Sequence, residues 1–196
     1  MKKLIILVFS FLSLAMTQSA YSNVTIIDLE GDIDGFGVGC PIANGLHYTD
    51  YGAYWADNRG VGDPSFTDYW YEGDKSWTHT YDLIGLTPVS ASLEIFVAGI
   101  VNQGDWSADV LVNNVSIGTI PPDTSANDLT RILTFNVPTG LLINPDGIKI
   151  DINNTNDGYI IDYSKLTIQA IPVPGAAALC GIGAAFIGWF KRRRVL

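Results

Sequence analysis

Four carboxylates occupy alternate positions near the start of the chain, at Asp28, Glu30, Asp32 and Asp34. On one side of an extended chain they repel one another unless a cation or solvent lies between them. Hard oxygen ligands at this density suit calcium. An EF-hand loop starting at Glu30 is excluded, because its twelfth position is Pro41 instead of a bidentate glutamate. The segment therefore predicts either a structural calcium site or a solvated acidic loop.

A second acidic group consists of Asp57, Asp63 and Asp68, in a segment that also contains asparagine and glycine. These residue types satisfy the backbone of a turn on their own. We expect turn chemistry here, with a second metal-binding loop as the alternative.

The segment from Cys40 to Trp77 is dense in aromatic residues. Aromatic faces can cover the apolar faces of pyranose rings while nearby Asp and Asn accept hydrogen bonds from hydroxyl groups. Core packing is the alternative, and we favour it. Adjacent side chains of a strand point to opposite faces, so at least one residue of Tyr69 to Tyr71 must point outward. The candidate carbohydrate contacts are Trp55, Trp70, Tyr71 and Trp77.

Catalytic signatures are sparse in this sequence. The two histidines, His47 and His79, lack a metal-binding spacing, and no Gly-x-Ser-x-Gly motif or glycine-rich phosphate loop is present. Glycosidases need only two carboxylates, so the 20 acidic residues leave that class open without singling out a pair. We expect a protein that is not an enzyme and has no catalytic residues. The alternative is a small glycan-active enzyme, a glycosidase or a lyase.

Short runs of alternating polarity, separated by Gly, Asn, Asp and Pro, predict β-strands as the elements that position these side chains. Val112 and Val115 flank Asn113-Asn114, a two-residue loop typical of a hairpin. The other expected strands cover residues 24–30, 78–83, 91–97, 133–137, 148–152 and 159–168. Together they predict an all-β domain over residues 23–170, an antiparallel two-layer β-sandwich.

The C-terminal half contains several segments in a characteristic order. They are the strand into Val112 to Val115, then 135–138, 141–142, Asp146-Gly147 leading into 148–152, and finally 158–163. This order resembles the galactose-binding-like jelly roll, many members of which bind sugars and hold a structural calcium. In these relatives the calcium joins acids near the first strand to an acid in the last. The resemblance therefore implies Glu30 or Asp32 together with Asp162, and the candidate calcium ligands are Glu30, Asp32, Asp34 and Asp162.

Charge is unevenly distributed along the chain. Residues 23–170 contain five basic and 20 acidic residues, a net charge of −15. Such a field repels phosphate backbones and anionic lipid, which argues against nucleic-acid binding. The other six basic residues lie at the two ends.

The N-terminal residues have the features of a secretory signal. Lys2 and Lys3 precede an apolar run from Leu4 to Met16, and small residues stand three and one before a cut after Ser22. A membrane anchor needs about 20 apolar residues, more than this run offers. We therefore predict a signal peptide over residues 1–22, cleaved after Ser22.

The C-terminal residues combine prolines, an apolar run and a basic end. The uncharged run 176–190 is followed by Lys191, Arg192, Arg193 and Arg194. A helix of this length spans about 22 Å, short of a hydrocarbon core of about 30 Å, so the basic side chains would snorkel or the bilayer would thin. We predict one transmembrane helix, with its basic end in the cytoplasm and the domain outside. The terminal cations disfavour the alternatives, a buried helix or a GPI anchor.

This tail, residues 171–196, resembles the PEP-CTERM sorting signal of exported bacterial proteins, which a membrane cysteine protease, the exosortase, recognises and cuts. Pro172 and Pro174 occupy the proline positions of the family's Val-Pro-Glu-Pro-like motif, with valine in place of glutamate. Gly175, the glycines of 176–190 and the basic end fit the remainder. The resemblance implies a Gram-negative cell, passage through the inner membrane, removal of the tail near Pro172 to Gly175, and association with exopolysaccharide or a biofilm matrix.

These features predict an exported, non-catalytic protein of the cell surface or extracellular matrix, processed at its sorting signal. The expected partners are an exosortase-type protease, extracellular polysaccharide, and the membrane through the C-terminal helix before processing. Calcium is the expected cofactor. The protein is expected in the inner membrane during transit and then at the cell surface or outside the cell.

Overall fold

The computed structural model describes residues 23–39, 41–47, 59–60, 63–99, 108–122, 129–142, 147–154 and 158–173. Contacts divide the chain into two compact units, of which the larger comprises Thr25–Ile84 and Pro88–Ala170. Among the described residues, the smaller unit includes Gly85–Thr87 and 171–173, and in it the Val173 N–H donates a 2.9 Å hydrogen bond to the Gly85 carbonyl oxygen. The candidate site lies in the larger unit.

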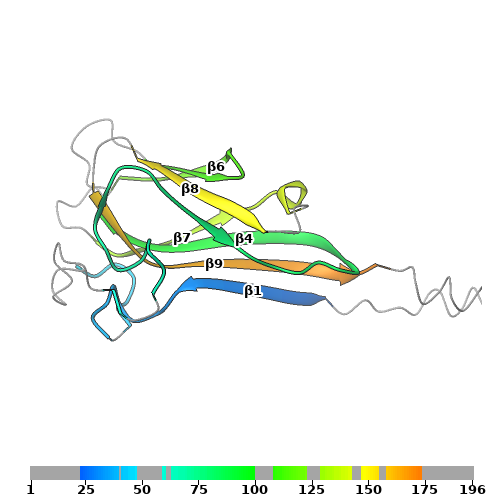
Figure 1. Ribbon diagram of the computed structural model, residues 1–196, viewed down its shortest axis with the longest axis horizontal. Coiled ribbons are helices and arrows are strands. Elements are labelled where there is room, and N and C mark those ends of the chain that lie inside the picture. The colour runs from blue at the N-terminus through cyan, green and yellow to red at the C-terminus, as the bar shows by residue number, and fades with distance from the viewer. Residues whose placement is uncertain are drawn as a thin grey trace, which may run out of the picture. The chain divides into compact units, whose positions relative to one another are not determined.

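The described residues form nine β-strands and one short 3-10 helix, which confirms the prediction of an all-β domain (Figure 1). The elements are β1 (Val24–Gly31), β2 (Tyr71–Glu72), β3 (Lys75–His79), β4 (Leu86–Gly99), β5 (Ala108–Val112), β6 (Val115–Ile120), β7 (Arg131–Asn136), η2 (Thr139–Leu141), β8 (Ile148–Asn154) and β9 (Gly158–Pro172). No helix within these ranges is long and apolar enough to cross a membrane. The predicted transmembrane helix at 176–190 lies outside the described residues.

The strands form two antiparallel sheets. One has the order β1-β9-β4-β7, with β2 also paired to β9, and the other has the order β3-β8-β5-β6. Figure 1 shows β1, β9 and β4 side by side, although they are far apart in sequence. The sheet order therefore brings residues near the start of the domain next to the last strand.

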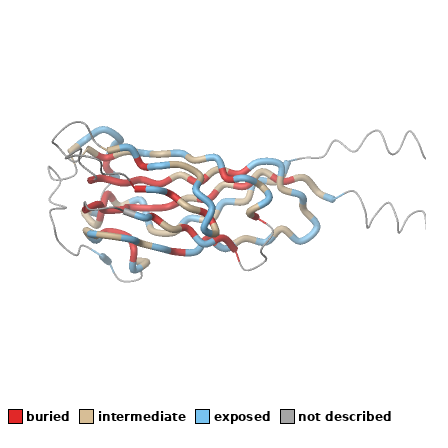
Figure 2. The backbone as a smooth tube through the Cα atoms, turned by 90° about the horizontal axis from the view of Figure 1, so that it is seen from above, coloured by how far each residue is buried: buried red, intermediate tan, exposed pale blue. Residues whose placement is uncertain are grey.

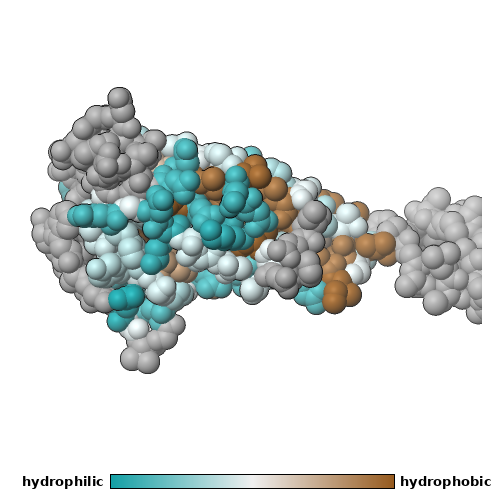
Figure 3. All heavy atoms as spheres, turned by 45° about the horizontal axis from the view of Figure 1, so that its top comes forward, coloured by the Kyte–Doolittle hydropathy of each residue, from teal (hydrophilic) through white to brown (hydrophobic). Residues whose placement is uncertain are grey.

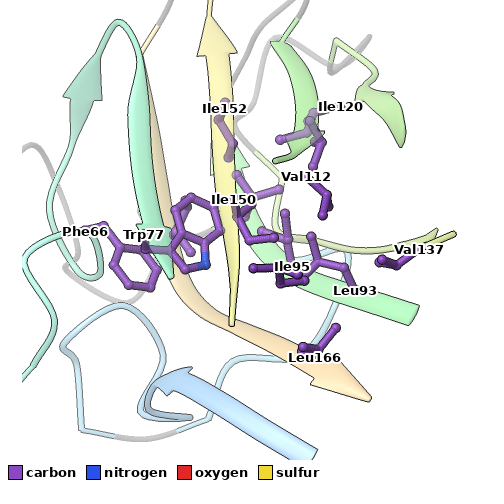
Figure 4. Packing of buried hydrophobic residues seen from close by; sticks show 14 of the residues in the cluster. Phe66, Trp77, Leu93, Ile95, Val112, Ile120, Val137, Ile150, Ile152 and Leu166 are labelled. Atoms are coloured by element: carbon purple, nitrogen blue, oxygen red, sulfur yellow. The ribbon is translucent and has the colours of Figure 1, made fainter. Parts of the chain in front are cut away.

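Alternating residues from both sheets build one hydrophobic core. Leu93 and Ile95 of β4 and Ile150 and Ile152 of β8 are fully buried in the same cluster as Val112 of β5 (Figure 4). Full burial of a Leu or Ile side chain stabilises a fold by roughly 1.5 to 3 kcal/mol. The alternation predicted for 148–152 is confirmed, because its apolar positions are the buried ones. In 91–97 the expected core positions are buried, but the intervening Phe96 is also only 2% exposed, because it packs in a second hydrophobic cluster.

The predicted hairpin is also confirmed. Val112 of β5 pairs with Val115 of β6, and both turn residues, Asn113 and Asn114, have positive φ angles of 49° and 67°. The turn is anchored to β8, because the Asn113 N–H donates to the Lys149 carbonyl oxygen and the Lys149 N–H donates to Asn113 Oδ1. Val112 is fully buried whereas Val115 is 47% exposed, so burial differs across this pair.

One expected strand lies earlier in the chain than predicted. The sequence predicts a strand at 78–83, whereas β3 is Lys75–His79, with Trp77 and His79 as its buried positions. The Thr80 N–H donates a 3.0 Å hydrogen bond to the Asp28 carboxylate of β1 and does not continue the hydrogen-bonded pairing with β8. A side chain distant in sequence therefore ends this strand.

A smaller hydrophobic cluster covers the other face of β4 and β9. It contains Phe96 of β4, Ile160 and Tyr163 of β9, and Phe36 from the segment after β1. The second cluster matters for the site because it holds the segment after β1 against β9.

Burial and polarity are divided between the inside and the surface of the described domain. Figure 2 shows continuous buried stretches along the strands. Figure 3 shows hydrophilic side chains gathered on the face that is in view.

Candidate metal centre

The segment that follows β1 turns away from the strand at Gly31 and carries Asp32 and Asp34. Gly31 has a φ of 89°, which favours glycine, and a Cβ there would lie 2.5 Å from the Asp162 carbonyl oxygen. The alternation of β1 ends at this residue. Asp28 and Glu30 therefore belong to the strand, whereas Asp32 and Asp34 belong to the turn.

Asp162 holds this turn in place from β9. Its Oδ1 accepts hydrogen bonds from the Phe36 N–H at 2.6 Å and from the Gly35 N–H at 3.1 Å. Phe36 adopts a φ of 62°, which is unusual for a bulky residue and is stabilised here by this bond and by burial of its ring. The core-facing positions of β9 change phase between Ile161 and Leu166, the stretch that contains Asp162.

The Asp162 side chain is 0% exposed, and its second oxygen, Oδ2, has no hydrogen-bond partner among the described residues. Its pKa is raised to about 7, mainly by burial and also by the nearby Asp34 and Asp32, against the lowering effect of the Phe36 N–H. A carboxyl of this kind favours either a proton or a cation.

Asp68 is the second buried carboxylate of the cluster. It is 0% exposed, and neither of its oxygens has a hydrogen-bond partner among the described residues. Its backbone has a φ of 55°, and its N–H donates a 2.8 Å hydrogen bond to the Ile161 carbonyl oxygen. Its pKa is raised to about 8, first by burial and then by neighbouring carboxylates, of which Asp162 contributes most.

Five carboxylates meet at this place in two overlapping groups. Asp32, Asp34 and Asp162 offer oxygen atoms that all lie within 4.8 Å of one another, and so do Asp32, Asp63 and Asp68. Buried oxygens without partners, surrounded by like charges, are the environment that a divalent cation neutralises. The donors are all hard oxygens, the ligand type of calcium and magnesium, so the residues fit the predicted calcium.

Three of the four predicted ligands, Asp32, Asp34 and Asp162, are brought together in the larger unit. Glu30 lies instead with Asp28 and His79, because it precedes the turn at Gly31. Asp63 and Asp68, for which the sequence favoured turn chemistry, complete the cluster. The sequence showed the acidic group to which they belong, with a second metal-binding loop as the alternative, but it did not show that this segment meets Asp32. Asp57 lies outside the described residues.

Sequence reasoning missed a hydrogen-bonded chain that links three strands. His79 Nδ1 lies 2.9 Å from Asp28 Oδ2, and His79 Nε2 lies 2.8 Å from Ser164 Oγ. The order resembles a Ser-His-Asp triad, but Ser164 and His79 are both 0% exposed, so neither is open to a substrate. Burial lowers the pKa of His79 despite its bond to Asp28. The chain joins β1, β3 and β9 as an internal structural contact.

The predicted carbohydrate contacts do not form an open platform in the described residues. Trp77 is only 7% exposed and stacks on Phe66, with 4.5 Å between ring centroids, so it is a core residue. Trp70 packs against the second hydrophobic cluster, and Tyr71 packs against the main core and donates its hydroxyl to the Ser65 carbonyl oxygen. Trp55 lies outside the described residues.

The predicted processing residues fall almost entirely outside the described ranges. Pro172 is the last residue of β9. Ser22, Pro174, Gly175, and Lys191 to Arg194 lie outside the described residues.

Comparisons with known proteins show only distant likenesses. No family model matches this sequence, and no curated protein matches it. Similar solved structures include BuGH86 in complex with neoagarooctaose, with 13% identity, a TM-score of 0.38, and coverage of 51% of this chain and 17% of that one. Dimeric latent PorU from Porphyromonas gingivalis has 11% identity, a TM-score of 0.41, and coverage of 76% of this chain and 13% of that one. The chain thus spans less than a fifth of either protein.

Proposed function

We propose that this chain is an exported, non-catalytic protein of the cell surface or extracellular matrix, whose domain is held together by structural calcium. The observation that carries the proposal is the pair of fully buried carboxylates, Asp68 and Asp162, with oxygens that lack partners among the described residues. Calcium sites of extracellular modules bind in the range of about 10⁻⁴ to 10⁻³ M, so such a domain reaches full stability only after export. The signal-like start of the sequence supports the same location.

The finer architecture that we propose is a jelly roll of the galactose-binding-like kind. Leaving out the short β2 and numbering the other strands consecutively converts the two sheet orders to 1-8-3-6 and 2-7-4-5. This alternation between two sheets is the pattern of a double Greek key. In this arrangement the first and last strands are neighbours, which supports a metal site built from the end of β1 and from β9.

Processing and matrix association form the rest of the proposal. The tail resembles a sorting signal cut by an exosortase-type protease, with extracellular polysaccharide as the proposed partner. The alternative, a glycan-active enzyme, needs an accessible pair of carboxylates. The two carboxyls with the largest pKa increases, Asp68 and Asp162, are instead closed to solvent. Their environment supports structural metal binding more directly than catalysis.

Calcium is expected to raise the melting temperature of the whole chain, purified in detergent. One ion at a hundredfold excess over its Kd stabilises the folded state by about 2.7 kcal/mol, which corresponds to roughly 5 to 11 °C. Asp162→Asn should remove most of the increment that comes from the ion bound by Asp162, while leaving the metal-free melting temperature unchanged or higher, because it relieves repulsion. Differential scanning calorimetry with and without millimolar calcium makes the measurement.

Asp109→Asn is the matched control, because Asp109 is exposed on β5 and the substitution makes the same change in charge. It should keep the full calcium increment. Equal melting temperatures for the wild-type chain with and without calcium would refute the structural calcium.

Export and processing predict two losses of mass in the native organism. Residues 1–22 should be absent from the surface protein, and a second cut should fall near Pro172 to Gly175. Deleting Lys191 to Arg194 should impair processing, because the stop signal and the orientation cue are lost together. Cell fractionation with intact-mass analysis checks both cuts, and a surface protein that retains its C-terminal residues would contradict the proposal.

A further inference from the structure

We infer that the carboxylate cluster holds two divalent cations, with Asp32 shared between them. One cation would lie among Asp32, Asp34 and Asp162, and the other among Asp32, Asp63 and Asp68. The inference rests on the proposed calcium-stabilised function and deepens it, because it gives the site a stoichiometry and a bridging residue.

The geometry supplies two overlapping positions. Each group of three carboxylates offers oxygens that lie within 4.8 Å of one another, and Asp32 is the member common to both. The groups also differ in origin. One joins the turn after β1 to Asp162 of β9, whereas the other joins that turn to the segment containing Asp63 and Asp68.

Each position has its own buried carboxylate with an oxygen that lacks a hydrogen-bond partner among the described residues. In the first group this oxygen is Oδ2 of Asp162, and in the second both oxygens of Asp68 are in this state. Both side chains are 0% exposed. One cation would be enough to give a partner to a single buried carboxylate. Here each of the two groups contains a buried carboxylate oxygen that lacks a partner.

Other members use one oxygen to fix the backbone. Asp34 Oδ1 accepts a 2.7 Å hydrogen bond from the Gly37 N–H, and Asp63 Oδ2 accepts one from the Gly60 N–H. Asp162 Oδ1 accepts hydrogen bonds from the N–H groups of Gly35 and Phe36 in the same way. A carboxylate has two oxygens, so the second oxygen of each can serve as a ligand. Ligands braced in this way lose little freedom when an ion binds.

Charge favours two ions over one. When ionised, the five carboxylates of the two groups carry five negative charges. One divalent cation would leave three of these charges uncompensated around two buried side chains, whereas two cations would leave one. Because uncompensated buried charge is costly, the second ion is the favoured state once calcium is plentiful.

The test counts calcium on the whole chain, purified in detergent, stripped of metal and dialysed against millimolar calcium. Elemental analysis and native mass spectrometry should both find two ions per wild-type chain. Asp34→Asn and Asp68→Asn should each lower the count to one, Asp32→Asn should weaken binding at both positions, and Asp109→Asn should keep two. A bridging Asp32 also predicts close-range energy transfer when the wild-type chain is loaded with a mixture of terbium and europium ions, a readout that needs no variant.

The outcomes separate the two proposals. One ion per wild-type chain, without energy transfer, would overturn the shared site while leaving structural calcium in place. No bound ion would overturn both. Retention of two ions by Asp68→Asn would refute the second position in particular.

Discussion

In metal-free buffer, the free energy of unfolding should fall by several kcal/mol, on the order of 5, as the pH rises from about 4 to about 8. Asp68 and Asp162 have pKa values raised to about 8 and about 7 in the folded domain, against 3.8 for an ordinary Asp. Within this window the folded state binds more protons than the unfolded state, so stability decreases with pH and levels off above about 8. The two carboxyls interact, so their contributions do not simply add.

His79 works in the opposite direction. Burial lowers its pKa below 6.5, so the unfolded chain takes up a proton first as the pH falls, and this group alone favours the folded state at higher pH. One histidine opposes two carboxyls with larger shifts, so the net slope should follow the carboxyls. Calcium should reverse that slope, because ionised carboxylates are the form that binds the metal.

Urea unfolding, followed by tryptophan fluorescence at a series of pH values, checks this expectation. Asp68→Asn should remove a large part of the metal-free slope, because the amide resembles the protonated acid and does not titrate. Asp109→Asn should leave the slope intact. A metal-free stability that is flat or rises between pH 5 and pH 8 would contradict the burial of these carboxyls.

Gly31→Ala is expected to destabilise the domain by about 2 to 6 kcal/mol. A side chain at a positive φ costs about 1 to 3 kcal/mol, and forcing atoms into a packed site costs about 1 to 3 kcal/mol more. The added Cβ would lie 2.5 Å from the Asp162 carbonyl oxygen and 2.7 Å from Thr67 Cγ2, so the turn after β1 and the strand β9 would have to separate. Calcium affinity should fall with stability, because the same separation moves Asp32 away from Asp162.

Gly39→Ala is the matched control for this substitution. Gly39 also has a positive φ, 78°, but no atom lies within 4 Å of the position that its Cβ would take. The substitution should therefore cost only the backbone strain, about 1 to 3 kcal/mol, and leave calcium affinity unchanged. Urea unfolding and calcium titration of both variants make the comparison, and equal losses would show that the close approach of Gly31 to β9 is unimportant.

Local pattern was enough to predict most strands. Ala91, Leu93, Ile95 and Val97 are buried in the structure because alternate positions of a strand share a face, and this periodicity can be read without knowing the partner strand. The Asn113-Asn114 turn could also be predicted from the sequence, since asparagine tolerates the positive φ that the hairpin requires. The end of β3 could not be predicted in this way, because the Thr80 N–H donates a hydrogen bond to the Asp28 carboxylate of another strand.

The candidate metal centre was predictable only in part. Asp32 and Asp34 stood out because acids at alternate positions repel, and the family resemblance added Asp162. The sequence grouped Glu30 with them because an unbroken strand would place all four acids on one side. The positive φ of Gly31 ends that alternation and leaves Glu30 with Asp28 and His79.

The amino-acid sequence by itself determined the all-β character of the domain, its acidic balance, and the presence of carboxylates suited to calcium, since composition and periodicity are local properties. Only the tertiary structure decided which carboxylates meet. Asp63 and Asp68 join Asp32 because the segment containing them reaches β9, where the Asp68 N–H bonds to Ile161. The same packing buries Asp68 and Asp162 and raises their pKa values, because desolvation depends on neighbours that come from distant parts of the chain.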